Sequence, residues 1–270
     1  MSKPDPAPQH AQRATDACAH AAGLPATTPA AMPLLNLTLC TYEENLALDE
    51  ALLEEAEVAE APREVLRLWQ PVSYGVVLGR SSMLHEEVHA DRCAARGVPV
   101  VRRVSGGASI VAGPGCLMYS LVLSYQLRPE LRSIDVAHRF VLGMLSAALS
   151  RRVPGVRCRG TSDLVLGDVK FSGNSVRCRR KHMLYHGTLL HDFPLTMISE
   201  FLREPPRQPE YRRGRPHQEF VTNLPLAAAE IEAALIDVWQ ASPADGWPRE
   251  RTTGLVQNRY RRTEWNETGR

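Results

Sequence analysis

Apolar residues recur along the chain with two different spacings. A period of three to four residues, as in Leu48, Leu52 and Ala56, predicts helices over residues 41–59, 83–96, 134–150, 195–203, 226–239 and 255–265. Short apolar or alternating runs predict strands over residues 35–40, 64–70, 75–80, 98–101, 116–124, 156–159, 163–166, 169–177 and 185–190. Because strands interleave with helices and short turns connect several of them, we predict an α+β fold. Its sheet should be mixed, mainly antiparallel and flanked by helices.

The same pattern divides the chain into a tail and one domain. Residues 1–33 are rich in alanine, proline and small polar residues and have no sustained period, so we predict a disordered N-terminal tail. Residues 34–270 carry the periodic segments and form the folded domain. At the start of its first helix, Thr41 and Glu44 have the spacing of a capping box.

Composition excludes several classes of partner. The 32 basic and 30 acidic residues give a net charge of +2, which provides no general argument for nucleic-acid binding. No apolar run is long enough to cross a bilayer, and no signal peptide is recognisable. The six cysteines lack CxxC spacing, which is typical of reduced thiols. We therefore expect a cytoplasmic protein that binds neither membrane nor nucleic acid.

A turn rich in arginine and glycine follows the strand at residues 98–101. It reads Arg-Arg-Val-Ser-Gly-Gly over residues 102–107. Arginine offers a planar fork of donors that suits carboxylate and phosphate oxygens, and paired glycines let an anion approach backbone N–H groups. The segment therefore indicates an anion-binding turn between two strands of a hairpin. A glycine hairpin with solvated arginines is the alternative.

Two further segments contain polar residues within predicted strands. Lys170 precedes Ser172-Gly173-Asn174 on one strand, and His186-Gly187 lies within the next. A lone lysine on a strand is usually solvated, and a lone histidine beside glycine is usually structural. Neither segment alone defines a site.

Taken in order, these segments resemble the catalytic domain of the lipoate–protein ligase A and octanoyltransferase family, which is related to biotin–protein ligases. The likeness covers about residue 35 onward. Its segments are Asn45–Leu52, the RRxSGG-like turn 102–107, the D-x(n)-G-x-K-x-SGN-like run 163–174, the HGTLL strand 186–190 and, more weakly, Phe220–Leu224. The resemblance implies the α+β fold of biotin/lipoate ligases and class II tRNA synthetases.

The implied reaction joins an eight-carbon acyl acid to a lysine of a lipoyl carrier domain, of the 2-oxoacid dehydrogenase E2 or glycine cleavage H protein type. A ligase would use lipoate, ATP and Mg²⁺ and form lipoyl-AMP. An octanoyltransferase would take octanoate from an acyl carrier protein thioester and need no cofactor. We expect the ligase-type activity, with octanoyl transfer as the alternative and a non-catalytic lobe that binds lipoyl groups or a partner as a third hypothesis.

The resemblance also implies roles for individual residues. Lys170 would be the catalytic lysine that contacts the acyl carbonyl, where a fixed cation relieves developing charge. The remaining predicted binding residues hold the acyl chain or the adenylate, with Gly187 leaving room for the chain: Arg103, Ser105, Gly106, Gly107, Ser172, Gly173, Asn174, His186 and Gly187. No metal ligand is predicted.

The chain departs from the family pattern after the Gly-Gly pair. Ala108 and the segment Val111–Cys116 replace residues that help ligases to hold adenylate and metal, which puts ATP use in question. Cys158 lies five residues before Asp163. Some octanoyltransferases have an acyl-accepting cysteine near this position, so a thioester at Cys158 is a second hypothesis beside that of a small buried residue.

Overall fold

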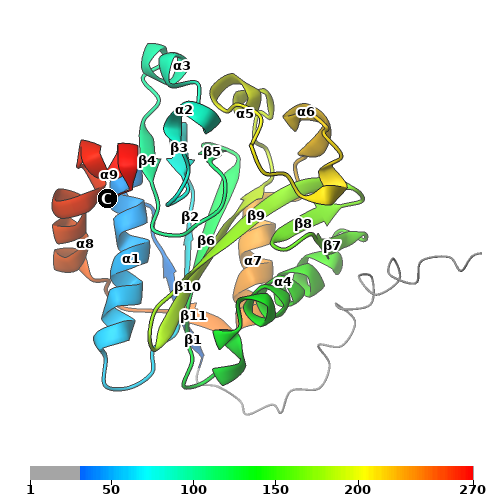
Figure 1. The fold of residues 1–270 in the computed structure, drawn as a ribbon. Helices are drawn as coiled ribbons and strands as arrows, with labels where there is room; N and C mark the ends of the chain where they lie inside the picture. Colours follow the sequence, from blue (N-terminus) through cyan, green and yellow to red (C-terminus); the bar gives the residue numbers. More distant parts are fainter. Residues whose placement is uncertain (1–30, 270) are drawn as a thin grey trace, which may run out of the picture.

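The computed structural model describes residues 31–269 and contains two sheets with helices around them (Figure 1). The large sheet has the strand order β11-β1-β2-β6-β10-β9-β8-β7. Its strands are β1 (Met32–Asn36), β2 (Val65–Trp69), β6 (Cys116–Ser124), β7 (Val156–Arg159), β8 (Asp163–Leu166), β9 (Val169–Cys178), β10 (His182–Leu190) and β11 (Ala241–Pro243). Only the pairs β1–β2 and β1–β11 are parallel. The prediction of a mixed, mainly antiparallel sheet is therefore confirmed.

A small sheet carries the arginine-glycine turn. It has the order β4-β3-β5 and is formed by β3 (Gly75–Leu78), β4 (Val100–Arg102) and β5 (Ile110–Ala112). The hairpin predicted from β4 to β5 is wrong, because β3 lies between them, parallel to β4 and antiparallel to β5. The turn therefore spans two strands that do not pair with each other, which leaves its backbone more open than a tight hairpin would.

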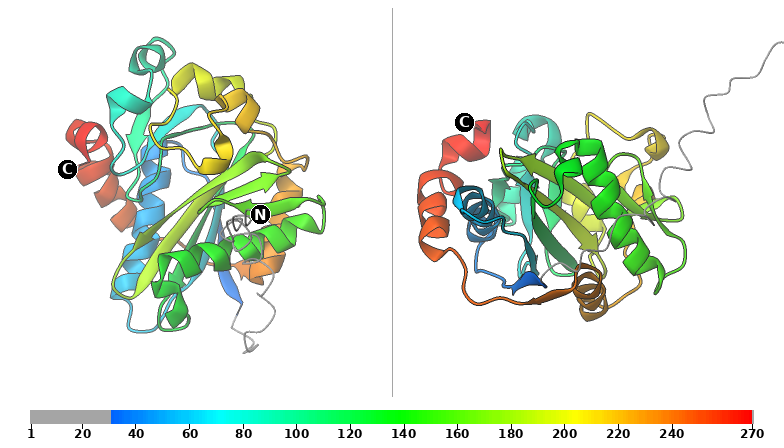
Figure 2. Two further views of the ribbon diagram at one scale, coloured as in Figure 1. Left: turned by 45° about the vertical axis from the view of Figure 1, so that its right-hand side comes forward. Right: turned by 90° about the horizontal axis from the view of Figure 1, so that it is seen from below.

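Helices cover both faces of the large sheet. On one face, α4 (Ile134–Ser150) and α7 (Ala228–Trp239) bury leucine, valine and tyrosine side chains. On the other face, α1 (Tyr42–Val58) packs against β10 and β6, and three C-terminal elements follow, of which the first two pack against α1 and the third packs against β4 (Figure 2). These elements are α8 (Arg249–Leu255), the π-helical turn η3 (Val256–Tyr260) and α9 (Thr263–Thr268). They replace the single helix predicted over residues 255–265.

The start of α1 explains where the first strand ends. Thr41 accepts a hydrogen bond from the Glu44 N–H at 3.2 Å, and the Glu44 carboxylate accepts one from the Thr41 N–H at 2.9 Å. This confirms the predicted capping box. The Asn45 side chain also accepts a hydrogen bond from the Leu39 N–H and donates one to the Leu39 carbonyl. Residues 38–40 are therefore part of the helix approach, and β1 lies at Met32–Asn36 instead of the predicted 35–40.

The helix predicted over residues 83–96 is interrupted. The structure has α2 (Leu84–Glu87) and α3 (Ala90–Ala95), with Val88 bridged to Leu202 between them. This tertiary pairing diverts the backbone and points the Glu87 carboxylate at Ser109, beside the arginine-glycine turn.

Shorter helices follow β10. They are α5 (Thr196–Phe201) and α6 (His217–Phe220), and the 3-10 turn η2 (Glu210–Arg212) lies between them; another 3-10 turn, η1 (Pro129–Arg132), precedes α4. The tail predicted for residues 1–33 lies outside the described residues except at its end, where Met32 and Pro33 belong to β1. Among residues 31–269, no helix has both the length and the apolar character needed to cross a membrane.

Candidate active site

The arginine-glycine turn is held together from within by Arg103. Its guanidinium is buried and donates to the carbonyl oxygens of Gly106 at 2.5 Å and Ala108 at 3.0 Å, and to the Ser105 hydroxyl at 3.1 Å. Burial lowers the pKa of Arg103 to about 10, against an opposing effect of Glu87. The side chain is therefore still a cation at neutral pH. It shapes the turn, and it would have to exchange these bonds to reach a phosphate.

The two glycines form the exposed edge of this turn. Gly107 has φ +88°, which an L side chain rarely adopts, and a Cβ added at Gly79 would lie 1.8 Å from the Gly107 carbonyl oxygen. No hydrogen-bond acceptor within residues 31–269 takes the backbone N–H of Gly106 or Gly107. Two N–H donors therefore remain available at the rim, as the anion-binding hypothesis requires.

The Arg102 side chain makes its contacts outside the turn, unlike that of Arg103. Its fully buried side chain donates to the carbonyl oxygens of Gly79 and Ser82 at 2.8 Å, and to those of Asn266 and Glu267 at 2.9 Å. These bonds join the arginine-glycine turn to α9. Arg102 is consequently a structural tie between two distant parts of the sequence.

Lys170 lies beside a carboxylate at the start of β9. Its Nζ is 2.7 Å from Oδ1 of the buried Asp163 on β8, and the Tyr211 hydroxyl donates to the other oxygen of Asp163 at 2.7 Å. A Cβ at Gly173 would lie 3.0 Å from the Lys170 Nζ, so glycine leaves room for the lysine to cross the strand. The lysine is therefore held at a defined place while its amine is only partly buried.

Ser172, Asn174 and Gly187 form a second polar group. The Asn174 side chain accepts from the Tyr119 hydroxyl at 2.5 Å and donates to the Ser162 carbonyl at 2.8 Å, and it also contacts Ser172. A Cβ at Gly187 would lie 1.9 Å from the Asn174 Oδ1. The Asn174 side chain therefore occupies the space that a Cβ would need, and the expectation that Gly187 leaves room for an acyl chain stays a prediction.

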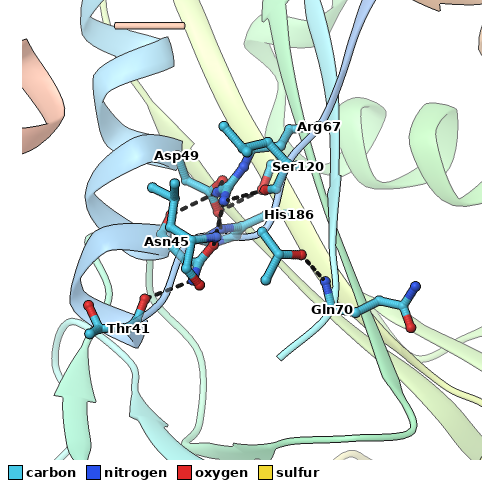
Figure 3. Close-up of polar contacts among 10 residues, drawn as sticks. Thr41, Asn45, Asp49, Arg67, Gln70, Ser120 and His186 are labelled. Carbon is cyan, nitrogen blue, oxygen red and sulfur yellow. Dashed lines mark hydrogen bonds and ion pairs between the residues drawn. The ribbon is translucent and has the colours of Figure 1, made fainter. Parts of the chain in front are cut away.

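His186 belongs to a buried network on the α1 face (Figure 3). Its Nε2 is 2.5 Å from the Ser105 hydroxyl, and its Nδ1 is 3.5 Å from the Asp49 carboxylate on α1. Asp49 also accepts from Arg67 at 2.5 Å and from Ser120 at 2.7 Å. The network links the arginine-glycine turn to α1.

The electrostatics of this network depend on Asp49. Burial by itself would raise the pKa of the Asp49 carboxyl, but Arg67 and the bonds from His186 and Ser120 lower it below its usual range. Sequence patterns assigned no role to Asp49 and did not suggest Arg67. The available signal was Asn45 and Asp49, two polar residues one helical turn apart that both prove to be buried.

Two cavities meet at Lys170. The inner cavity, about 160 Å³, extends toward α1 and has Leu46, Trp69, Val77, Met118 and Tyr119 in its wall. The outer cavity, about 180 Å³, extends toward α5 and α6 and has Arg203, Arg207, Arg212, His217 and Phe220 in its wall. The two cavities share Ala108, Ser109, Ile110, Lys170, Gly173 and Thr188. An elongated apolar group and an anionic group could therefore meet at the lysine amine.

The predicted site residues are brought together, with one exception. The inner cavity is lined by Arg103, Gly107, Lys170, Gly173, Asn174, His186 and Gly187, and the outer one by Lys170, Ser172 and Gly173. Ser105 and Gly106 line neither cavity, but Ser105 contacts His186 and the Gly106 carbonyl accepts from Arg103. Cys158 lines neither cavity. It is half-buried on the edge strand β7 and packs against the cluster under α4. Cys116 is buried, and burial raises the pKa of its thiol to about 12.

The outer cavity contains groups that the sequence did not suggest. Arg212 pairs with Glu204, and its guanidinium lies 4.9 Å from the centre of the Phe220 ring. The Glu87 carboxylate accepts from both the N–H and the hydroxyl of Ser109 at 2.7 Å. Among residues 31–269, no cluster of three or more His, Cys, Asp or Glu side chains is arranged to hold a metal ion.

Fold and site define a class of protein: an α+β lobe in which an apolar cavity and a basic cavity meet at a lysine. A family model described as the lipoyl protein ligase A/B catalytic domain matches residues 41–237, and the chain belongs to this family.

Relatives of known name and structure agree with this assignment. A protein of Aeropyrum pernix assigned as a lipoate-protein ligase A is 32% identical over 199 residues, covering 73% of this chain and 70% of the relative. The chain spans 45% of the length of a Mycoplasma genitalium relative that is 30% identical. The bipartite lipoate protein ligase of Thermoplasma acidophilum superposes with a TM-score of 0.76 at 22% identity, covering 90% of this chain and 98% of that one. An ATP-bound lipoate-protein ligase A gives a TM-score of 0.72 at 22% identity, with coverage of 89% and 100%. The predicted family and fold are therefore confirmed.

Proposed function

We propose that the protein joins lipoate to a lysine of a lipoyl carrier domain, with ATP as the second substrate and an acyl-adenylate as intermediate. The observation that carries this proposal is the meeting of an apolar cavity and a basic cavity at Lys170. Family membership and relatives that are named lipoate-protein ligases bear out the prediction of a lipoate–protein ligase-type enzyme. A structural neighbour holds ATP, and another is described with its E2 lipoyl domain, which supports both the second substrate and the acceptor.

The inner cavity suits the acyl chain of lipoate. Leu46, Trp69, Val77 and Met118 provide apolar walls. Burying the chain is worth roughly 0.8 kcal/mol per CH₂ group. The carboxylate of a chain bound in this way would point toward Lys170, at the junction of the two cavities.

The outer cavity suits the nucleotide. Arg203, Arg207 and Arg212 supply positive charge for phosphate oxygens. The free N–H groups of Gly106 and Gly107 lie at the edge of the inner cavity, next to Ala108, which lines both cavities. Phe220 provides an aromatic ring in the same wall. These groups compensate for the residues of the family pattern that are replaced from Ala108 to Cys116.

The residues present also fit the expected Mg²⁺. This ion keeps several waters and is held by one or two carboxylates together with substrate phosphates. The Glu87 carboxylate lies in the wall of the outer cavity. Its Oε2 accepts two hydrogen bonds from Ser109, whereas its Oε1 accepts none from residues 31–269. Glu87 would hold the ion, which when bound would neutralise phosphate charge.

The two chemical steps place the same demand on Lys170. In the first, a lipoate carboxylate oxygen bonds to the α-phosphorus of ATP and pyrophosphate leaves. In the second, the neutral amine of the carrier lysine bonds to the acyl carbon, the C–O bond to AMP breaks, and the nitrogen releases a proton to solvent. Negative charge develops on the α-phosphate and then on the acyl oxygen, and the fixed Lys170 cation stabilises both. Asp163 would position this cation between the steps.

Octanoyl transfer from an acyl carrier protein remains the alternative reaction, and a glycine cleavage H protein an alternative acceptor. The position of Cys158 outside both cavities argues against a thioester at this residue, so such a transfer would have to be direct. Lys170 and its two cavities argue against a non-catalytic lobe.

The test is to weigh an apo lipoyl domain after incubation with the protein and one of three donors: lipoate plus ATP and Mg²⁺, octanoyl–acyl carrier protein, or synthetic lipoyl-AMP. We expect a gain of one lipoyl group with the first and third donors, and no gain for Lys170→Ala. Gain only with the octanoyl carrier would support the transferase. Gain with lipoyl-AMP alone would indicate that the adenylation step needs a separate component. Lys170→Ala with wild-type yields would refute the site.

A further inference from the structure

Four arginines from three separate segments gather on the α1 side of the molecule. Arg177 and Arg179 lie on β9 and at its end, Arg80 follows β3, and Arg259 lies in η3. Arg80 and Arg179 are exposed, and the other two are half-buried. We call this surface the basic rim. None of its members lines the inner or the outer cavity.

The basic rim borders the exposed edge of the candidate site. The Arg80 N–H donates to the Ser105 carbonyl at 2.8 Å, and the Ser175 hydroxyl donates to the Gly106 carbonyl at 2.8 Å. Arg177 is two residues beyond Ser175 on the same strand, and it pairs with Leu184, which packs under α1. Arg80 and Arg177 therefore flank the exposed glycine edge of the inner cavity from two sides.

The charge of the basic rim is only partly balanced. The buried Glu50 pairs with Arg259 and lies 3.8 Å from Arg179, and Glu54 lies 3.9 Å from Arg179 but also pairs with Arg251. Arg80 and Arg177 form no ion pair with any residue among 31–269, and the buried Nε of Arg177 has no hydrogen-bond partner there. Burial lowers the pKa of Arg177, and repulsion by Arg80, Arg179 and Arg259 adds to this effect. A cluster that repels itself when free gains most from a negatively charged partner.

We propose that the basic rim docks the carrier domain through acidic side chains around its acceptor lysine, and so steers that lysine to the glycine edge of the site. This inference rests on the proposed function, because it takes the carrier domain as the acceptor. Docking charges at the edge of an interface act mainly on the association rate and on its salt dependence. The basic rim should therefore affect the transfer step and leave the formation of the acyl-adenylate unchanged.

The test compares two acceptors for the same acyl-adenylate. An apo E2 lipoyl domain must dock, whereas hydroxylamine takes the acyl group from the adenylate as a hydroxamate without docking. For Arg80→Glu/Arg177→Glu we expect kcat/KM for the lipoyl domain to fall on the order of tenfold at low salt, through KM more than kcat. Hydroxamate formation should be unchanged. Added salt should lower the wild-type kcat/KM and have much less effect on the variant.

Arg139→Glu/Arg152→Glu is the matched control, because it makes the same total charge change at two exposed positions, one on α4 and one just after it, on the opposite face of the sheet. Equal kcat/KM for this control and for Arg80→Glu/Arg177→Glu would overturn the proposal. The proposal would also be overturned if Arg80→Glu/Arg177→Glu kept the wild-type kcat/KM for the lipoyl domain but no longer bound tRNA. That result would assign the basic rim to nucleic acid. If the wild type forms neither hydroxamate nor lipoylated domain, the proposed function fails. Calorimetric titration of the apo domain into both variants then still decides whether the basic rim docks it.

Discussion

The amine of Lys170 and the carboxylate of Asp163 lie 2.7 Å apart, and Tyr211 donates to the second oxygen of the same carboxylate. Tyr211 belongs to the arginine-rich segment that lies across the outer cavity. The position of Lys170 and the position of this segment therefore depend on one shared carboxylate.

Tyr211→Phe should loosen the segment from residue 203 to 216. A hydrogen bond to a charged group contributes about 1.5–3 kcal/mol, and its loss leaves one oxygen of the buried Asp163 without its donor. We expect trypsin to cut in this segment about tenfold faster or more, because cleavage follows the population of the open form. Tyr74→Phe, at a half-buried tyrosine that packs on Phe193, is the control. Identical cleavage rates for the two variants would show that the Tyr211 bond does not hold the segment.

Removing the partner of Asp49 should destabilise the fold. Arg67→Met leaves a buried carboxylate beside His186 and Ser120 without its cation, which typically costs about 3–5 kcal/mol of unfolding free energy. Arg151→Met breaks an exposed pair with Asp237 and should change stability by less than about 1 kcal/mol. Chemical denaturation measures both. A loss at Arg67 no larger than that at Arg151 would contradict the importance of the buried pair.

The same pair predicts how stability depends on pH. The folded-state pKa of Asp49 is lowered, so its contribution to stability is fully present above the pKa of about 3.9 that the unfolded chain has, and it is lost as the pH falls through the folded value. Arg67→Met removes the main opposing charge, so burial should then raise the pKa of Asp49. The stability gap between wild type and variant should therefore narrow between pH 7 and pH 4.5. If the unfolding free energies of wild type and variant change in parallel with pH across this range, Asp49 does not titrate as stated.

Gly187→Ala and Gly143→Ala should have opposite effects. A Cβ at Gly187 would displace the Asn174 side chain and its bonds to Tyr119 and Ser162, at a cost of about 1–3 kcal/mol, and acyl transfer should fall with it. Gly143 lies inside α4 with open space around its Cβ position, so alanine there should stabilise by about 0.5–1 kcal/mol. Melting temperatures and lipoylation rates measure both variants. A tolerated Gly187→Ala would mean that Asn174 does not need its present position.

Cys158→Ser should leave the lipoylation rate within about twofold of the wild type, since single changes away from the site act mainly on stability. The cysteine lies on the edge strand β7 and lines neither cavity. A large loss of turnover, together with an acylated Cys158 peptide in the mass spectrum, would restore the thioester hypothesis.

Features set by neighbours in sequence were predictable, and features set by distant partners were not. The Thr41–Glu44 capping box and the bounds of α4 follow from local spacing, and both agree with the prediction. The arginine-glycine turn was recognised as a motif, but its supposed hairpin was wrong because the insertion of β3 between β4 and β5 is a tertiary choice. No pattern in the sequence predicts that β3 lies between β4 and β5.

The residues of the candidate site divide in the same way, into those that a sequence motif named and those that only tertiary packing brings together. Lys170, His186 and the glycines were named because a family resemblance joined motifs that lie far apart. Asp49 and Arg67 were missed because an acidic residue on a helix and an arginine on a strand are ordinary alone, and only packing of α1 onto β2 and β6 pairs them. Tyr211 was hidden in a segment whose composition is typical of a solvated loop.

The Arg102 tie has a consequence for synthesis of the protein on the ribosome. The family match ends at residue 237, yet the backbone carbonyls that receive the Arg102 guanidinium include those of Asn266 and Glu267. A nascent chain that has already exposed every motif of the site still carries a charged side chain without these acceptors. The arginine-glycine turn can reach its final form only after Asn266 and Glu267 have left the exit tunnel, so a nascent chain that has exposed only the family-matched segment should not yet be active.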